Sequence, residues 1–409
     1  MTAFQGASLL DRIRTGDYLD RARVRRLAVI FLVVGLLSLG ALIATSDGFK
    51  DRLGRPLGTD FMAFYVAGTI ADEKGGAAAY DAAEQYAAHQ RMFGEEKPRF
   101  WPYLYPPAFL FIAAALAFLP YLAAWLIWSG GTLALYLGAM QRLAPGAFAL
   151  LLAVSFPAVL TNFMHGQNGF LIAALFAAAA HFLIAKRKLA AGLAFGLIAV
   201  KPQYGLLIPI ALAAAGEWRV FWAAAAGAFA LALAPTLAFG ADVWPGFFES
   251  MRAARVEVLE SGAIGFEKIQ SVFSQAKMLG APTVVAYAAQ GLFALSLAVM
   301  TARLWRGGAS TPLKMAGLII ASLLASPYVV DYDLVILAPA MALLIGEAAA
   351  RGFRPYERTL LLAAAVAPVI ARPIGVIAPL SLGLVAMIAL GAAVRARAAD
   401  EAGAAASRS

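Results

Sequence analysis

An uncharged stretch near the N-terminus, LAVIFLVVGLLSLGALIAT at residues 27–45, most limits what this chain can fold into. A run of this length can cross the roughly 30 Å hydrocarbon core of a bilayer as an α-helix. A secretory signal peptide has a shorter apolar region that ends in a small-residue cleavage site. The run therefore predicts a membrane anchor that stays in the protein.

Further apolar runs continue to about residue 394 and place the whole chain in the membrane class. Of its 409 residues, 62% are hydrophobic and only 14% are charged, whereas soluble proteins have about 25% charged residues. Transmembrane β-barrels show short segments of alternating hydrophobicity instead, so the sequence predicts an all-α polytopic membrane protein. The chain has no cysteine, which excludes thiol catalysis and thiolate metal sites.

Basic residues cluster beside the apolar runs, for example in AKRK at 185–188 and in RGFRPYER at 351–358. The positive-inside rule assigns these clusters to the cytoplasm and leaves two long polar segments outside, roughly 46–104 and 239–280. The outer segments contain more acidic than basic residues, and the inner ones the reverse. The formal net charge of +9 is therefore a topology signal, and we expect no binding to nucleic acid.

About twelve crossings satisfy this charge pattern, with both termini inside. The count requires that residues 105–119, a short run bounded by prolines, lie in the outer leaflet without crossing. It also requires a break near Lys201 and Pro202, because proline disfavours helix at the residue before it. The predicted crossings are 27–45, 122–140, 146–162, 167–185, two within 189–215, 219–238, 281–302, 312–327, 333–349, 359–376 and 378–394.

The predicted organisation has three parts. A cytoplasmic segment at 1–26 precedes a transmembrane domain at 27–394, and a disordered cytoplasmic tail follows at 395–409. Within the transmembrane domain, the first outer loop occupies 46–120 and carries membrane-surface helices, one of them in YDAAEQYAAHQRMF. The second large outer loop occupies 239–280.

This topology brings every unusual polar motif to the outer side of the membrane. Polar and ionisable groups that gather on one membrane face are typical of a single functional site. The motifs are GTDF at 58–61, YLYPP at 103–107, HGQN at 165–168, KPQ at 201–203 and SPYVVDYD at 326–333.

Asp60 lies at the membrane boundary, and two interpretations of its carboxylate are open. In one, it caps a helix that begins at Phe61 by accepting backbone N–H groups. In the other, it is a general base, because a carboxylate in a poorly solvated pocket is a stronger base toward a sugar hydroxyl. Both hold if the cap also orients the carboxylate.

The other candidate residues have similar alternatives. Asp331 and Asp333 either cap the next helix or, beside Tyr328, hold an acceptor sugar or join Asp60 around a divalent cation. Lys201 either extends to an interface or contacts a lipid phosphate. His165 and Gln167 either belong to a tight turn with no further role or form hydrogen bonds with a sugar or a phosphate. Tyr105 belongs either to an interfacial aromatic belt or to a sugar-binding site.

The order of the motifs resembles glycosyltransferase family 87. The resemblance spans roughly residues 27–350 and rests on DFMAFYVAG, AAAYD, YLYPPAFLFIAAALAFLPYLAAWLIW, HGQNGFLIAAL, AVKPQYGLLIPIAL and ASPYVVDYDLVILAPAMALL. It implies a GT-C architecture with an extracytoplasmic active site in which Asp60 is the catalytic carboxylate. One motif departs from the actinobacterial mannosyltransferases, which carry histidine next to the late aspartate where this chain has Tyr332. A role of that histidine therefore does not carry over to this chain, and the departure leaves the identity of the transferred sugar open.

The resemblance implies a membrane glycosyltransferase of cell-envelope glycolipid synthesis. It would move a mannose-like hexose or a pentose from a polyprenyl-phosphate donor to an extracytoplasmic lipid or glycan, with Asp60 as general base and inversion at the anomeric carbon. We expect Lys201 at the donor phosphate. The candidates for sugar or acceptor contacts are Asp331, Asp333, His165, Gln167, Tyr105 and Tyr328.

No metal site is assigned, and a requirement for a divalent cation stays open. The expected location is the bacterial plasma membrane, with the site on the periplasmic face. A transporter or flippase of lipid-linked sugars, or a ligase, is the alternative. Transporters tend to have inverted repeats and ionisable groups near the middle of the membrane, and the sequence offers neither.

Overall fold

The computed structural model describes residues 8–94 and 102–406, and in these ranges the only β-structure is a few isolated bridges. Seven helical segments are long and apolar enough to cross a membrane. They are α2 (Arg21–Ala44), α6 (Tyr121–Leu143), α12 (Trp218–Phe239), α15 (Thr283–Arg306), η7 (Asp331–Ile336) with α17 (Leu337–Arg351), α18 (Glu357–Ile377) and α19 (Leu382–Ala406). The pair α7 (Ala147–Ser155) and α8 (Pro157–His165), bent by 54°, forms an eighth.

Each predicted crossing has a helical counterpart, although four of the counterparts are short. These are α9 (Gly169–Ile184), α10 with η3 (Lys188–Val200), η4 with α11 (Pro202–Ala214) and α16 (Thr311–Ala325). The chain breaks at Lys201, as predicted, since η3 (Ile198–Val200) ends before it and η4 (Pro202–Tyr204) begins after it. The all-α polytopic class is confirmed, and the number of helices that cross the bilayer stays a prediction.

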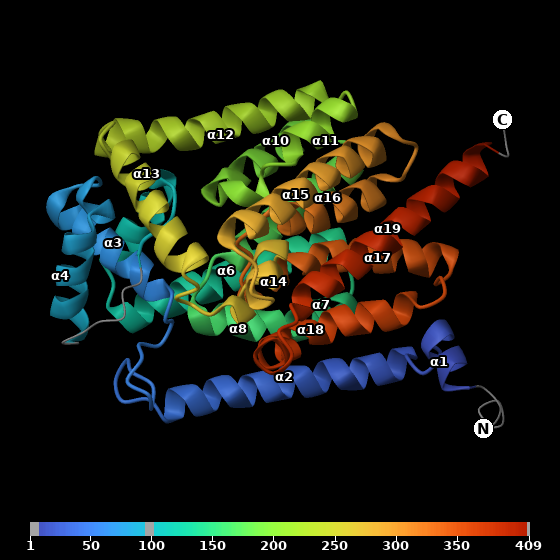
Figure 1. Ribbon diagram of the computed structural model, residues 1–409, viewed down its shortest axis with the longest axis horizontal. Helices are drawn as coiled ribbons and strands as arrows, with labels where there is room; N and C mark the ends of the chain where they lie inside the picture. The colour runs from blue at the N-terminus through green and yellow to red at the C-terminus, as the bar shows by residue number, and fades with distance from the viewer. Residues whose placement is uncertain (1–7, 95–101, 407–409) are drawn as a thin grey trace.

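The long helices lie side by side, and some of the shorter helices of the predicted outer loops gather at one end (Figure 1). That end holds α3 (Phe61–Lys74), α4 (Ala82–Phe93) and α13 (Val243–Ala254), and both chain termini lie at the opposite end. Apart from the elements of residues 105–119, which are described below, the remaining elements are α1 (Leu9–Thr15), η1 (Ala78–Tyr80), η5 (Arg255–Glu260), η6 (Phe266–Lys268) and α14 (Val272–Met278).

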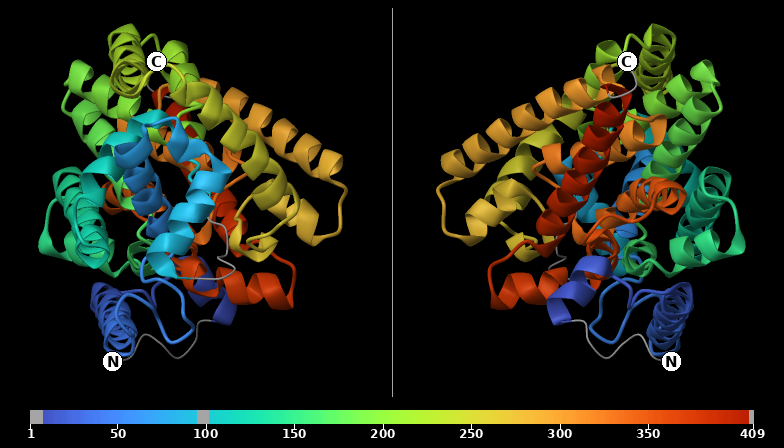
Figure 2. Two further views of the ribbon diagram at one scale, coloured as in Figure 1. Left: turned by 90° about the vertical axis from the view of Figure 1, so that its left-hand side faces the viewer. Right: turned by 90° about the vertical axis from the view of Figure 1, so that its right-hand side faces the viewer.

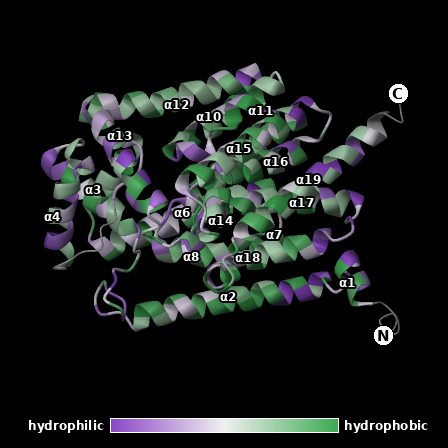
Figure 3. Cartoon of the chain, in the orientation of Figure 1, coloured by the Kyte–Doolittle hydropathy of each residue, from purple (hydrophilic) through white to green (hydrophobic). Residues whose placement is uncertain are grey.

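Helix α2 lies at the edge of the bundle in the views along its length (Figure 2). Ala28 is its only buried residue, and most of its length is coloured as hydrophobic (Figure 3). An exposed apolar helix is expected where lipid rather than water surrounds the protein.

Residues 46–120, the predicted first outer loop, contain several short helices, and their side of the membrane stays a prediction. Helix α3 begins at Phe61, and α4 covers the predicted surface helix. Residues 105–119 contain η2 (Pro107–Phe109) and α5 (Leu110–Ala117), which together are too short to span the membrane. Helix α5 packs on α3 so closely that a Cβ on Gly68 would lie 2.1 Å from the Ala113 carbonyl oxygen.

The predicted disordered tail is wrong for residues 395–406, because α19 continues through Ala406. Its alanine-rich sequence favours helix, and Arg397, only 5% exposed, donates from Nε and Nη2 to the carboxylate of Glu357. This buried ion pair fixes α19 against α18. Residues 407–409 lie outside the described ranges.

Candidate active site

Two loops meet at the start of α3 and position Asp60 against the junction of α8 and α9. The backbone N–H of Asp60 donates to the His165 carbonyl at 3.2 Å. Gly58 and Gly166 both have left-handed backbones, with φ of 69° and 66°. A Cβ on either would lie within 3 Å of the Trp125 indole, at 2.5 and 2.9 Å. Glycine in both motifs therefore lets the two loops close around one tryptophan.

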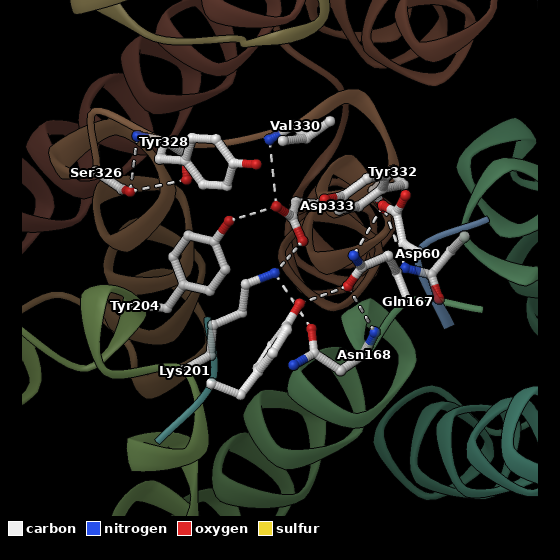
Figure 4. A network of polar contacts seen from close by, with 12 residues as sticks. Asp60, Gln167, Asn168, Lys201, Tyr204, Ser326, Tyr328, Val330, Tyr332 and Asp333 are labelled. Atoms are coloured by element: carbon white, nitrogen blue, oxygen red, sulfur yellow. Dashed lines mark hydrogen bonds and ion pairs between the residues drawn. The ribbon is translucent and has the colours of Figure 1, made fainter. Parts of the chain in front are cut away.

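The Asp60 carboxylate does not cap α3, so the capping interpretation is wrong. Asp60 occupies the N-cap position, but its side chain makes no capping hydrogen bond. A residue that caps a helix through its side chain usually has an extended backbone. The backbone of Asp60 is instead helical, with φ −87° and ψ −24°. Its half-buried carboxylate instead accepts a hydrogen bond from Gln167 Nε2 at 2.9 Å (Figure 4).

Tyr105 fixes the orientation of the Gln167 amide. Its hydroxyl donates to Gln167 Oε1 at 2.7 Å, which leaves Nε2 to donate to Asp60. Burial, with the carboxylates of Asp333 and Asp60 nearby, raises the pKa of Tyr105 well above its ordinary value. Tyr105 therefore keeps its proton at neutral pH and donates to Gln167. Both hydrogen bonds, from Tyr105 to Gln167 and from Gln167 to Asp60, point toward the carboxylate.

A second, deeper layer joins Lys201 to Asp333. Lys201 Nζ lies 2.7 Å from Asp333 Oδ1 and 3.2 Å from Asn168 Oδ1. Asp333 Oδ2 accepts from the Tyr204 hydroxyl at 2.8 Å and from the Val330 N–H at 3.2 Å. Figure 4 shows these side chains converging from separate elements. Lys201 is 4% exposed, so it does not extend to an interface as one interpretation held.

Asp331 and Asp333 point to different partners. A 3₁₀ helix has three residues per turn, so side chains two positions apart point in directions about 120° apart. Asp331 pairs with Arg372, whereas Asp333 pairs with Lys201. Asp333 also accepts the Val330 N–H, which fits the local capping role that the sequence suggested; Asp331 makes no such bond.

The geometry does not support a cation held by Asp60, Asp331 and Asp333 together. Each of the two later carboxylates already faces a basic side chain. Among residues 8–94 and 102–406, no group of three histidine, aspartate or glutamate side chains has the arrangement of a metal site.

His165 and Tyr328 lie at the half-buried rim of the site. His165 ends α8, and its Nδ1 is 2.8 Å from the Thr161 carbonyl. Its ring lies 5.6 Å from that of Tyr332. Burial and the nearby Asp60 and Asp333 raise the pKa of Tyr328, which keeps its hydroxyl protonated.

All five polar motifs supply residues to this region, so they meet in space as expected. The outer side of the membrane on which the sequence placed them stays a prediction. The sequence interpretation missed Asn168, Tyr204 and Arg372. Arg372 was detectable, because it is a lone charge inside the apolar run 359–376, and an ionisable residue in such a run is usually functional. Asn168 and Tyr204 gave no signal of their own, since amides and tyrosines are common at membrane boundaries.

The chain matches the family described as glycosyltransferase family 87 over residues 103–327, which is more than half its length. The match includes Tyr105, His165, Gln167 and Lys201 and ends before Asp331. No curated protein gives a significant match. The family resemblance read from the motifs is confirmed.

Proposed function

The chain belongs to glycosyltransferase family 87, and from this premise we propose that it transfers a sugar from a polyprenyl-phosphate donor to an acceptor hydroxyl outside the cytoplasm, with Asp60 as the general base. It is a membrane glycosyltransferase by family and by its apolar helices. The donor, the acceptor side of the membrane and the roles of the residues are our proposal.

The observation that carries the proposal is the state of the Asp60 carboxylate. It makes no cap, and within the described ranges it forms no ion pair. In the described part of the chain, its side-chain partners are both neutral: the amide of Gln167 at 2.9 Å and the hydroxyl of Thr59 at 3.5 Å. A carboxylate with unused acceptor positions, held in place and half-buried, is suited to take a proton from a bound hydroxyl.

The proposed reaction is a single displacement. The acceptor oxygen attacks the anomeric carbon, while its proton passes to Asp60. The bond between the anomeric carbon and the phosphate oxygen breaks, and the polyprenyl phosphate leaves with the electron pair. Attack from the side opposite the leaving group inverts the anomeric configuration. Gln167 and Tyr105 keep the carboxylate aimed at the acceptor.

The deeper layer is proposed as the floor of the site. A donor phosphate would reach Lys201, as expected from the sequence, only if its ammonium left Asp333 and Asn168, to which it is bonded at 2.7 and 3.2 Å. Separating a buried ion pair costs several kcal/mol, about 3–5 kcal/mol when one partner is lost. We therefore assign Lys201 and Asp333 to holding η7 in place. His165 and Tyr328, at the rim, are left to contact the sugar or the acceptor.

Transfer assays with the purified protein and defined polyprenyl-phosphate sugars test the proposal. Asp60→Asn should reduce transfer about 10²–10⁴-fold, the usual contribution of a general base. Asp242→Asn is a matched control, because Asp242 also occupies an N-cap position without a capping bond and is exposed. It should transfer sugar at the wild-type rate.

Two results would contradict this function. Near wild-type transfer by a folded Asp60→Asn protein would remove Asp60 as the base. Movement of the lipid-linked sugar across vesicles without a new glycosidic bond would instead indicate a flippase.

A further inference from the structure

Arg372 is a charged residue within the apolar helix α18, and Asp331 holds it from one side only. Its Nε and Nη2 donate to the same oxygen, Asp331 Oδ2, at 3.0 and 2.6 Å. Nη1 makes no hydrogen bond to the described residues, and the side chain is 40% exposed. A guanidinium with one edge occupied and another edge free can still bind a planar anion or a phosphate through paired hydrogen bonds.

Asp331 contributes an unused acceptor beside this guanidinium. The residue is 4% exposed, and its second oxygen, Oδ1, has no hydrogen-bond partner among the described residues. A buried acceptor without a partner is costly in a protein at rest. The pair thus joins a buried carboxylate, which fixes one edge of the guanidinium, to a half-exposed cation with donors left for an anion.

The surface around Arg372 favours an anion that carries a hydrocarbon chain. Val369 and Val376 lie three residues before and four residues after it, so all three share one face of α18. Both valines are exposed, at 48% and 69%. A soluble phosphate would gain nothing from this apolar stripe, whereas a lipid chain would pack along it.

Helix α18 places this pair beside the candidate active site. It packs against η7, the element that also carries Asp333, and against α8, which ends at His165. Asp331 is separated from Asp333 only by Tyr332, whose ring lies over His165. A ligand on Arg372 would therefore approach the reacting centre from the lipid-facing side.

We propose that Arg372 binds the phosphate of the polyprenyl-phosphate donor and that Asp331 is its positioning residue. Asp331 holds the guanidinium through its Nε and Nη2 edge, and the prenyl chain lies along Val369 and Val376. This inference rests on the proposed function, and it replaces Lys201 with Arg372 at the phosphate.

The experiment measures binding of undecaprenyl phosphate, the product without sugar, to the purified protein in detergent. Arg372→Gln should raise the Kd at least about tenfold, the loss expected for charge-assisted hydrogen bonds. Because this change leaves the buried Asp331 without its cation, the double variant R372Q/D331N is the decisive one. It removes both charges, should fold, and should show the same loss of binding.

Matched variants separate positioning from charge. Asp331→Asn leaves the charge of Arg372 in place but removes the carboxylate that orients its side chain. We therefore expect a raised KM for the donor and an unchanged KM for the acceptor. Arg142→Gln, an exposed arginine in the last turn of α6, should bind as the wild type does.

Two results would overturn the inference. One is wild-type affinity for undecaprenyl phosphate in a folded R372Q/D331N protein. The other is displacement of undecaprenyl phosphate by equal amounts of phosphatidylglycerol or by inorganic phosphate, which would assign Arg372 to ordinary lipids or to free anions. Failure of the proposed function looks different: undecaprenyl phosphate would still bind through Arg372, but no sugar would be transferred.

Discussion

Replacing Lys201 by methionine separates a structural role from a ligand-binding role. The ion pair between Lys201 and Asp333 has side chains that are 5% and 0% exposed, with 2.7 Å between Nζ and Oδ1. Removing one partner of such a pair costs about 3–5 kcal/mol, because the remaining charge stays buried. The hydrogen bonds from Tyr204 and Val330 to Asp333 remain, but each contributes roughly 0.5–1.5 kcal/mol and does not replace a cation.

At roughly 2–4 °C per kcal/mol for a large domain, Lys201→Met should lower the Tm by about 6–20 °C. The assay is thermal unfolding of the purified protein in detergent without any ligand. The double variant K201M/D333N removes both charges and should recover most of that loss. Lys188→Met is the control, because its ion pair with Glu217 is 46% and 31% exposed and such pairs contribute less than about 1 kcal/mol. An unchanged Tm in Lys201→Met, together with lost binding of undecaprenyl phosphate, would refute this reasoning and return Lys201 to the donor phosphate.

Three further predictions concern the loops around the proposed base. Gln167→Leu should reduce transfer about tenfold or more in a folded protein, because Asp60 loses the donor that aims it; a transfer assay at saturating donor checks this. Tyr105→Phe removes the hydroxyl that donates to Gln167. Because the pKa of Tyr105 is raised in the folded protein, this tyrosine ionises at a lower pH in the unfolded chain. The free energy of unfolding of the wild type therefore falls as the pH rises above about 10. Between pH 9 and pH 11, the free energy of unfolding should therefore fall less steeply in Tyr105→Phe than in the wild type. Gly166→Ala should destabilise the protein by about 1–3 kcal/mol in a thermal-unfolding assay, because a Cβ there would lie 2.5 Å from Phe61 Cβ at a left-handed backbone.

Local sequence predicted the helices and the gathering of the motifs well. Apolar runs bounded by proline and glycine specify helices without reference to the rest of the chain, and the break at Lys201 follows from Pro202 alone. Charge placement then specified which motifs share a side. This is why residues as distant as Asp60 and Asp333 were expected in one region before any contact was known.

Pairing within the site was not predictable, because it depends on backbone angles and on partners far along the chain. Asp60 precedes a helix as a capping residue does, and only its helical ψ of −24° keeps the carboxylate from capping. Asp331 and Asp333 are two positions apart, yet one meets Arg372 and the other Lys201. The prediction of a disordered tail was wrong for a related reason. The composition of the tail suggests disorder, but Arg397 forms a buried ion pair with Glu357, which is distant in sequence.

The three aspartates of the region differ in a way that bears on the chemistry. Asp331 and Asp333 each face a cation, and a carboxylate that binds a cation loses that interaction when it takes up a proton. Proton transfer to either would therefore break an ion pair that also positions η7. Asp60, with a neutral amide as its partner, can be protonated and deprotonated without disturbing an ion pair. In the reaction proposed above, the paired aspartates would hold the site in shape and Asp60 would exchange the proton. Arg372, with donors that Asp331 leaves unused, would remain for the phosphate.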